Sequence, residues 1–254
     1  MRAISQEVLG GPEVLTVVEL DRPMPGPTDV LVRVHAAGVN PTDWLHRASG
    51  LYLGTPPFVL GWDVSGVVEA VGAGVTLHKV GEEVFGMLDY PSGAGAYAEY
   101  VSAPSRNFAR KPAGIDHIEA AALPVAALTA WQALVDTADL QPGQRVLIHA
   151  AAGGVGHLAV QLAKALGAYV IGTASASKHD CVRSLGADEV IDYSQTDFAR
   201  TCGTSTSCST PSAVTTAHAR WIPCGLAAYS SPSSSRTAPP PRPQPRSVAS
   251  GWHT

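Results

Sequence analysis

Residues 151–156 read Ala-Ala-Gly-Gly-Val-Gly, and this glycine turn lies between two segments of different hydrophobic period. Arg145 to His149 is an apolar run typical of a buried strand, whereas His157 to Leu166 has the spacing of an amphipathic helix. A strand, a glycine turn and a helix in this order bring free backbone N–H groups and the positive end of a helix dipole to one point. The pattern predicts a phosphate cradle and restricts this half of the chain to folds built on strand–turn–helix units.

The spacing within the glycine turn is close to that of a dinucleotide fingerprint. Ala151 stands where the first glycine usually lies, and Gly153 and Gly156 hold the second and third positions. Small residues let the backbone approach a pyrophosphate. The alternative is a tight turn whose glycines serve only its backbone conformation. The predicted cofactor-binding residues of the turn are Ala152, Gly153, Gly154, Val155 and Gly156.

Strands and helices alternate around this turn from about Asp116 onward, with a helix break at Pro124. Such alternation predicts an α/β domain with a parallel, doubly wound sheet. The expected elements, in chain order, are helices 118–123 and 126–135, strand 145–150, helix 157–166, strand 169–172, helix 178–185 and strand 189–192.

The first 118 residues differ in character, because they contain short β-branched runs bounded by Pro or Gly. Prolines at positions 23, 25 and 27 mark a loop that no helix could cross. Many short strands separated by turn signals predict a barrel or a sandwich. The expected strands are 14–18, 30–34, 64–71, 83–87 and 96–101.

The composition changes again after Arg200. Residues 201–254 contain no Asp, Glu or Lys, and a Pro/Ser run without hydrophobic period extends from Ser231 to Arg246. Such a segment cannot bury enough apolar surface to offset its chain entropy, so we expect it to be disordered. We therefore divide the chain into a barrel domain (1–118), an α/β domain (119–200) and a low-complexity tail (201–254).

The charge and composition of the 254 residues exclude several classes of partner. A net charge of −4 argues against nucleic acid as a partner. We find neither a signal peptide nor an apolar stretch of about 18 residues, so the sequence predicts no membrane span and a cytoplasmic protein. The cysteines have neither metal-ligand spacing nor a compact disulfide pattern; they are Cys181, Cys202, Cys208 and Cys224.

The segment after the second parallel strand bears on the choice of nucleotide. Sites that prefer NAD usually place a carboxylate there to bind the ribose 2′-hydroxyl. Residues 173–178 instead offer hydroxyls, including that of Ser175, and the cation of Lys178, with no acid before Asp180. A 2′-phosphate suits this set, so NADPH is favoured over NADH. A solvated residue at a helix start is the alternative for Lys178.

Several separated motifs carry a resemblance to a known family. They are Ala37-Gly38-Val39-Asn40-Pro41-Thr42-Asp43, Gly61-Trp62-Asp63-Val64-Ser65-Gly66-Val67-Val68, Gly81-Glu82-Glu83-Val84-Phe85-Gly86, residues 150–156 and Gln161-Leu162-Ala163-Lys164. In this order they resemble the medium-chain dehydrogenase/reductase superfamily, and most of all its zinc-free quinone oxidoreductase branch, over residues 1 to about 195. The resemblance implies a GroES-like β-barrel domain, a Rossmann nucleotide-binding domain and a cofactor in the cleft between them.

The resemblance also implies roles for individual residues. Asn40, Tyr52 and Thr129 would line a nicotinamide pocket, with Tyr52 and Asn40 as the catalytic candidates. Tyr52 could polarise or protonate a carbonyl oxygen, and Tyr193 with Lys178 would grip the adenosine phosphate. The alternative for Tyr52 is a packing role, that for Asn40 is a turn position beside Pro41, and that for Thr129 is a position that caps or faces a helix. Asp43 and Asp63 are expected to hold loops together.

The same positions argue against zinc. Zinc-bearing relatives have a cysteine where Asn40 stands, a His-Glu pair where Trp62-Asp63 stands, and a four-cysteine structural loop. No cysteine precedes Cys181, so neither thiolate site can be assembled and we predict no metal ligands.

These inferences favour an NADPH-dependent reductase of quinones or other α,β-unsaturated carbonyl compounds, with a homodimer expected from the resemblance. A non-catalytic NADPH-binding protein or an inactive truncated remnant is the alternative, and a zinc-dependent alcohol dehydrogenase is less favoured. The family's later strands and return segment are not recognisable after Phe198. We therefore hypothesise a reading-frame shift near Arg200, which translation of the other two frames would test.

Overall fold

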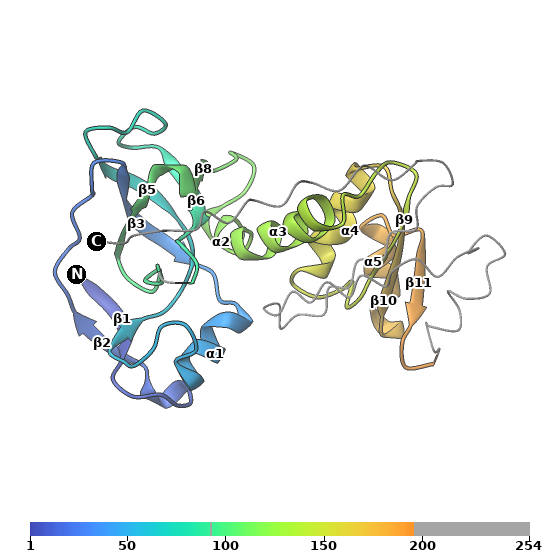
Figure 1. The fold of residues 1–254 in the computed structure, drawn as a ribbon, viewed down its shortest axis with the longest axis horizontal. Helices are drawn as coiled ribbons and strands as arrows, with labels where there is room; N and C mark the ends of the chain where they lie inside the picture. The colour runs from blue at the N-terminus through green and yellow to red at the C-terminus, as the bar shows by residue number, and fades with distance from the viewer. Residues whose placement is uncertain (92, 196–254) are drawn as a thin grey trace, which may run out of the picture.

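The computed structural model describes residues 1–91 and 93–195 (Figure 1). The N-terminal part is a β-barrel domain made of two antiparallel sheets, with strand orders β2-β1-β4 and β7-β3-β5-β6-β8. Its strands are β1 (Arg2–Gln6), β2 (Thr16–Glu19), β3 (Asp29–Ala37), β4 (Phe58–Val59), β5 (Asp63–Val71), β6 (Glu83–Met87), β7 (Tyr100–Pro104) and β8 (Phe108–Arg110), with 3-10 turns at Pro12–Val14 and Ser105–Asn107.

Alternating residues of the longer strands form the core of the barrel. Val30 and Val32 of β3 and Val64 and Val68 of β5 are almost fully buried, and Trp62 precedes β5 with no exposed surface. Burial itself does not alternate strictly, because Leu31 between Val30 and Val32 is 2% exposed and β5 begins with four buried residues. The bounds of β6 are those predicted from the sequence, which confirms this strand.

The strand predicted over 96–101 is wrong in its bounds. Residues 97–99 bond to β1 before the chain joins β3: Ile4 N–H donates to Tyr97 O at 2.8 Å and Glu99 N–H donates to Arg2 O at 3.0 Å, while Glu99 O accepts Val34 N–H of β3 at 2.9 Å. β7 begins only at Tyr100. The sequence pattern could not distinguish one strand from a chain that changes partner within an apolar run.

Helix α1 (Pro41–Ser49), inside the barrel domain, was not predicted. Asn40 and Asp43 form a capping box at its start, with Pro41 at the first position. It ends at Gly50, whose φ of +69° is the left-handed conformation that favours glycine. The start and stop signals are present in the sequence, but the helix is hidden among strands.

The second part of the chain is an α/β unit whose three strands are parallel in the order β11-β10-β9. This confirms the α/β class, with a GroES-like barrel and a partial Rossmann sheet. Its elements are α2 (His117–Ala121), α3 (Pro124–Trp131), the π-helical turn η3 (Gln132–Thr137), β9 (Arg145–Ile148), α4 (Gly156–Ala165), β10 (Tyr169–Ala174), the 3-10 turn η4 (Ala176–Lys178), α5 (His179–Ser184) and β11 (Glu189–Asp192).

Helices α2 and α3 lie between the barrel strands and the parallel sheet (Figure 1). α2 packs on β5 and β3, and α3 packs on α4. Ala130 of α3 therefore joins the same core as Val146 of β9 and Val160 of α4. The division at residue 118 stays a prediction, and the predicted disorder of 201–254 lies outside the described residues.

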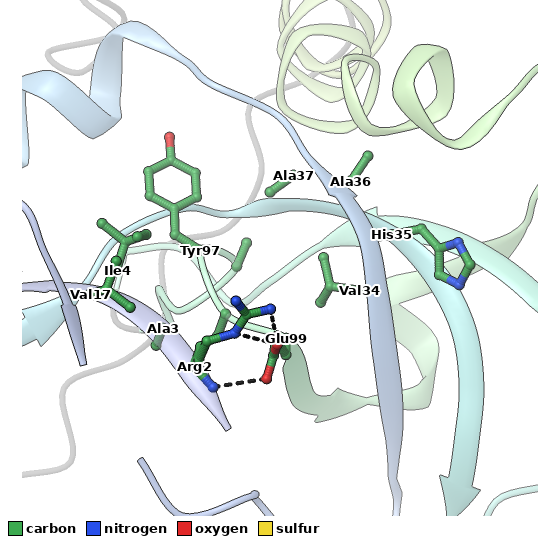
Figure 2. Close-up of a pocket in the computed structure, with 12 residues that line it drawn as sticks. Arg2, Ala3, Ile4, Val17, Val34, His35, Ala36, Ala37, Tyr97 and Glu99 are labelled. Carbon is green, nitrogen blue, oxygen red and sulfur yellow. Dashed lines mark hydrogen bonds and ion pairs between the residues drawn. The ribbon is translucent and has the colours of Figure 1, made fainter. Parts of the chain in front are cut away.

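A pocket of about 360 Å³ opens on the barrel where residues 96–99 run between β1 and β3 (Figure 2). Its wall is mostly alanine and valine, and its charged pair is satisfied internally, since Arg2 Nη2 donates to Glu99 Oε1 at 2.7 Å. None of the predicted site residues lines this pocket. Within the described part of the chain, no helix is both long and apolar enough to cross a bilayer.

Candidate functional site

The glycine turn follows β9 directly and is fixed by the neighbouring strand β10. Ala151 N–H donates to Thr173 O at 2.9 Å, and Gly153 N–H donates to Ala150 O at 2.8 Å. Ala150 has a φ of +49°, so the left-handed residue lies one position before Ala151, where we placed the first fingerprint glycine. An alanine in this conformation is uncommon and marks a turn held by its surroundings.

Two glycines of the turn have opposite environments. A Cβ on Gly156 would collide with Ala150 O and lie 2.8 Å from Ala151 Cα, so α4 approaches the end of β9 as closely as glycine allows. A Cβ on Gly154 would meet nothing within 4 Å. The turn is therefore closed toward the strand and open at Gly154, as a backbone cradle for a phosphate requires.

Thr173 is a site residue that the sequence analysis missed. It is 2% exposed, and its Oγ1 lies 3.2 Å from Ala150 N and 3.2 Å from His149 Nδ1. Burial lowers the pKa of His149, so its imidazole is neutral at pH 7. A hydroxyl inside a β-branched strand gives no sequence signal of this role, because only the pairing of β10 with β9 brings it to the turn.

The other predicted cofactor residues lie at the same edge of the sheet. Ser175 follows the last residue of β10, and Lys178 ends the 3-10 turn after it, with Lys178 N–H donating to Ser175 O at 2.8 Å. Tyr193 follows the last residue of β11 and is 58% exposed. Because parallel strands end at one edge, the turn, the hydroxyl and the cation share the side on which α/β sheets bind ligands.

Asn40 lies at the start of α1 and is bonded to β5. Its Nδ2 donates to Asp63 Oδ2 at 2.8 Å, and its backbone N–H donates to Asp43 Oδ2 at 2.6 Å. Asp63 Oδ1 accepts the backbone N–H of Val125, in the first turn of α3, at 2.8 Å. Asp63 thus joins Asn40 to β5 and the barrel to α3, whereas the bond of Asp43 to Asn40 lies within the start of α1.

Thr129 belongs to the same chain of hydrogen bonds. Its Oγ1 donates to Val125 O at 2.6 Å, one helical turn earlier. The hydroxyl proton is thereby committed to the helix, and the oxygen keeps capacity to accept a hydrogen bond. The predicted pocket residues Asn40 and Thr129 are therefore linked through Asp63 and Val125.

Both aspartates of this junction are buried, and their pKa values are raised. Burial is the main cause at Asp63 and raises the pKa of that carboxyl to about 7, although the hydrogen bonds from Asn40 and Val125 lower it. Burial also raises the pKa of Asp43, which is 2% exposed. The carboxyls therefore stay partly protonated in a pH range where an exposed aspartate is fully ionised.

Tyr52 lies in a cluster of four rings beside α1. The ring of His46 lies 4.8 Å from that of Trp62 and 5.6 Å from that of Tyr52, and the rings of Tyr52 and Tyr90 are 6.1 Å apart. Partial burial, with a contribution from Tyr90, raises the pKa of Tyr52. Its phenol is protonated at neutral pH and can donate a hydrogen bond, which the predicted role requires.

No group of three or more His, Cys, Asp or Glu side chains with the geometry to hold a metal ion occurs among residues 1–91 and 93–195. Where a zinc enzyme would have a cysteine and a His-Glu pair, this chain has the bonded pair of Asn40 and Asp63 and the buried ring of Trp62.

Comparison with known families agrees with this architecture. Residues 26–113 match the alcohol dehydrogenase GroES-like domain, and residues 154–216 match the family described as zinc-binding dehydrogenase. The second match continues beyond residue 195, where we expected the likeness to end. The fold, the glycine turn and the two matches together define the two-domain architecture of medium-chain dehydrogenases/reductases.

Individual relatives narrow this assignment. The chain is 42% identical over 192 residues to a quinone-oxidoreductase homolog of Spinacia oleracea, covering 72% of this chain and 58% of that one. It is 41% identical to a 2-haloacrylate reductase of a Burkholderia species, covering 75% and 58% of the two chains. The quinone oxidoreductase of Escherichia coli crystallised with NADPH superposes with a TM-score of 0.70 at 37% identity, covering 79% and 61%. The chain belongs to the quinone oxidoreductase branch of the medium-chain dehydrogenase/reductase superfamily, and it spans about three fifths of the length of these relatives.

Proposed function

We propose that this protein is an NADPH-dependent, zinc-free reductase of quinones or other α,β-unsaturated carbonyl compounds. The observation that best supports this function is the glycine turn, closed at Gly156 and open at Gly154, on the edge of the sheet that carries Ser175 and Lys178. The relatives support the substrate class, since their names include quinone and haloacrylate reduction. A cytoplasmic location and a homodimer stay predictions from the sequence.

NADPH supplies a hydride when it is bound, and the chain's residues supply binding and orientation. Backbone N–H groups of the turn would bind the pyrophosphate, and Lys178 with Ser175 would bind the 2′-phosphate. Asn40 would donate a hydrogen bond to the substrate carbonyl, and the Tyr52 phenol would donate a proton to the product oxygen. Hydride and proton together account for the two hydrogens that the carbonyl compound gains.

A titration of the chain with NADPH, followed by fluorescence, tests cofactor binding. NADPH oxidation across a panel of quinones and enones tests catalysis. Micromolar binding with turnover of at least one compound is the expected result. Binding without turnover would instead favour a non-catalytic NADPH-binding protein. Absence of binding would overturn both.

We expect Lys178→Ala to weaken NADPH binding by roughly 10-fold or more while leaving NADH binding unchanged. A charge-assisted hydrogen bond to a phosphate contributes about 1.5–3 kcal/mol, and only NADPH carries the 2′-phosphate. Dissociation constants for both nucleotides measure this effect. Lys79→Ala, an exposed lysine of the barrel loop, is the matched control. Equal loss for both nucleotides would show that Lys178 does not read the 2′ position.

A further inference from the structure

The Asp63 carboxyl joins two groups that come from different parts of the chain. Oδ2 accepts from the Asn40 side chain and Oδ1 accepts from the Val125 backbone, both at 2.8 Å. The residue that precedes α3, Leu123, makes no side-chain cap. A carboxyl from β5 therefore serves as the cap of a helix that packs on the nucleotide domain, where the helix dipole favours negative charge.

The fold leaves space for this carboxyl at Gly38. A Cβ on Gly38 would lie 2.8 Å from Asp63 Cβ and 3.1 Å from Asp63 Oδ2, and it would collide with Ala121 O. Asp63 itself has no exposed surface. The carboxyl thus occupies a specific buried position between β3, α1 and α3. It accepts hydrogen bonds from two donors there, which a side chain held only for packing would not need.

We propose that Asp63 is a positioning residue for hydride transfer: its ionised carboxyl fixes the direction of the Asn40 amide and holds α3, with Thr129, at a set distance from it. This inference rests on the proposed function. A carboxylate only accepts hydrogen bonds, so Asn40 must turn Nδ2 toward it. One N–H of Nδ2 is then committed to Asp63, and the other is left to donate to a substrate oxygen.

Protonation of Asp63 would release this constraint. A protonated carboxyl can donate to Asn40 Oδ1, so the amide can reverse and present a different end to the substrate. Burial, with a smaller contribution from the Asp43 carboxyl on α1, raises the pKa of Asp63 to about 7 despite the hydrogen bonds from Asn40 and Val125. The Tyr97 phenol is the other ionisable group coupled to Asp63 among the described residues. Positioning is therefore expected to change near neutral pH.

The first test uses the unmodified protein and does not depend on activity. The side-chain amide signals of Asn40 are followed by NMR between pH 5 and pH 9, and they are assigned from their loss in Asn40→Ser. We expect a single titration step near pH 7 that is absent from Asp63→Asn. Signals that do not titrate in the unmodified protein would overturn the proposal, even if Asp63→Asn fails to fold.

The second test measures kinetics. We expect Asp63→Asn to lower kcat roughly 10-fold, because one oriented hydrogen bond is lost, with little change in the KM for NADPH. The inflection near pH 7 in kcat/KM should disappear. Asp43→Asn is the matched control, since it removes a neighbouring buried carboxyl but not the bond to the Asn40 amide; the inflection should then move to lower pH. An inflection that persists in Asp63→Asn would contradict the assignment.

These outcomes separate the two proposals. If the unmodified protein turns over no quinone or enone, the proposed function fails, whereas the NMR step still supports or excludes the orientation of Asn40 by Asp63.

The pH dependence of folding stability gives a further test of the raised pKa of Asp63. The pKa of Asp63 is raised on folding, so its contribution to stability is complete below about pH 4 and is lost as the pH rises toward 7. Asp63→Asn should show a smaller fall in unfolding midpoint over that range.

Discussion

Gly156→Ala is expected to destabilise the protein by about 3 kcal/mol, in the upper range for overpacking. The added Cβ would meet backbone atoms, Ala150 O and Ala151 Cα, which cannot move aside as a flexible side chain could. Natural domains are stable by only about 5–15 kcal/mol, so such a loss is a large part of the total. Urea unfolding measures it, and NADPH affinity should fall at least about 10-fold as the start of α4 moves.

Two other glycines provide matched controls. Gly154→Ala adds the same methyl group two residues earlier, where nothing lies within 4 Å, so stability should be unchanged. If a phosphate binds at this opening, NADPH affinity should nevertheless fall. Gly114→Ala also enters open space, but before α2 and away from the turn, and should change neither quantity. Wild-type NADPH affinity in Gly154→Ala would show that the phosphate is not bound there.

Tyr52→Phe is expected to lower kcat by about 100-fold, the lower limit for loss of a general acid, with a small change in KM. The hydroxyl is removed while the ring keeps its contacts with His46 and Tyr90. The pKa of Tyr52 is raised, so the phenol stays protonated through the neutral range and supplies a proton there. Steady-state kinetics with a quinone and with an enone measure the effect.

Tyr90→Phe is the control for this prediction, because it belongs to the same cluster and its hydroxyl lies 3.3 Å from Thr42 Oγ1. We expect a change of a few-fold at most. If both variants keep the wild-type kcat, water supplies the proton and Tyr52 has the packing role that was its alternative. If both lose activity equally, the loss reflects the cluster and not the Tyr52 phenol.

Most of the fold could be predicted from local patterns in the sequence. Strand 189–192 was placed with its observed bounds, and helix 157–166 differs from α4 by one residue at each end. The helix has a clear hydrophobic period and is followed by Gly167, and the strand is a short apolar run that follows Gly186, so short-range signals are sufficient. The errors lie where partners change, as in residues 97–99, or where a helix interrupts strands, as in α1. The short strands β1, β4 and β8 were also not predicted, and the strand predicted from residue 14 begins at Thr16 because Pro12–Val14 form a 3-10 turn.

The sequence by itself determined the glycine turn, five of the eight barrel strands of the described residues, the absence of zinc-ligating cysteines and the family, because each depends on residue type and spacing along the chain. Only the tertiary structure decided that the carboxyl of Asp63 meets both Asn40 and Val125, and that Thr173 holds the turn. These contacts join residues that are 23 to 62 positions apart. No local period encodes such a contact, since it depends on which strands pair and on which helix packs against them.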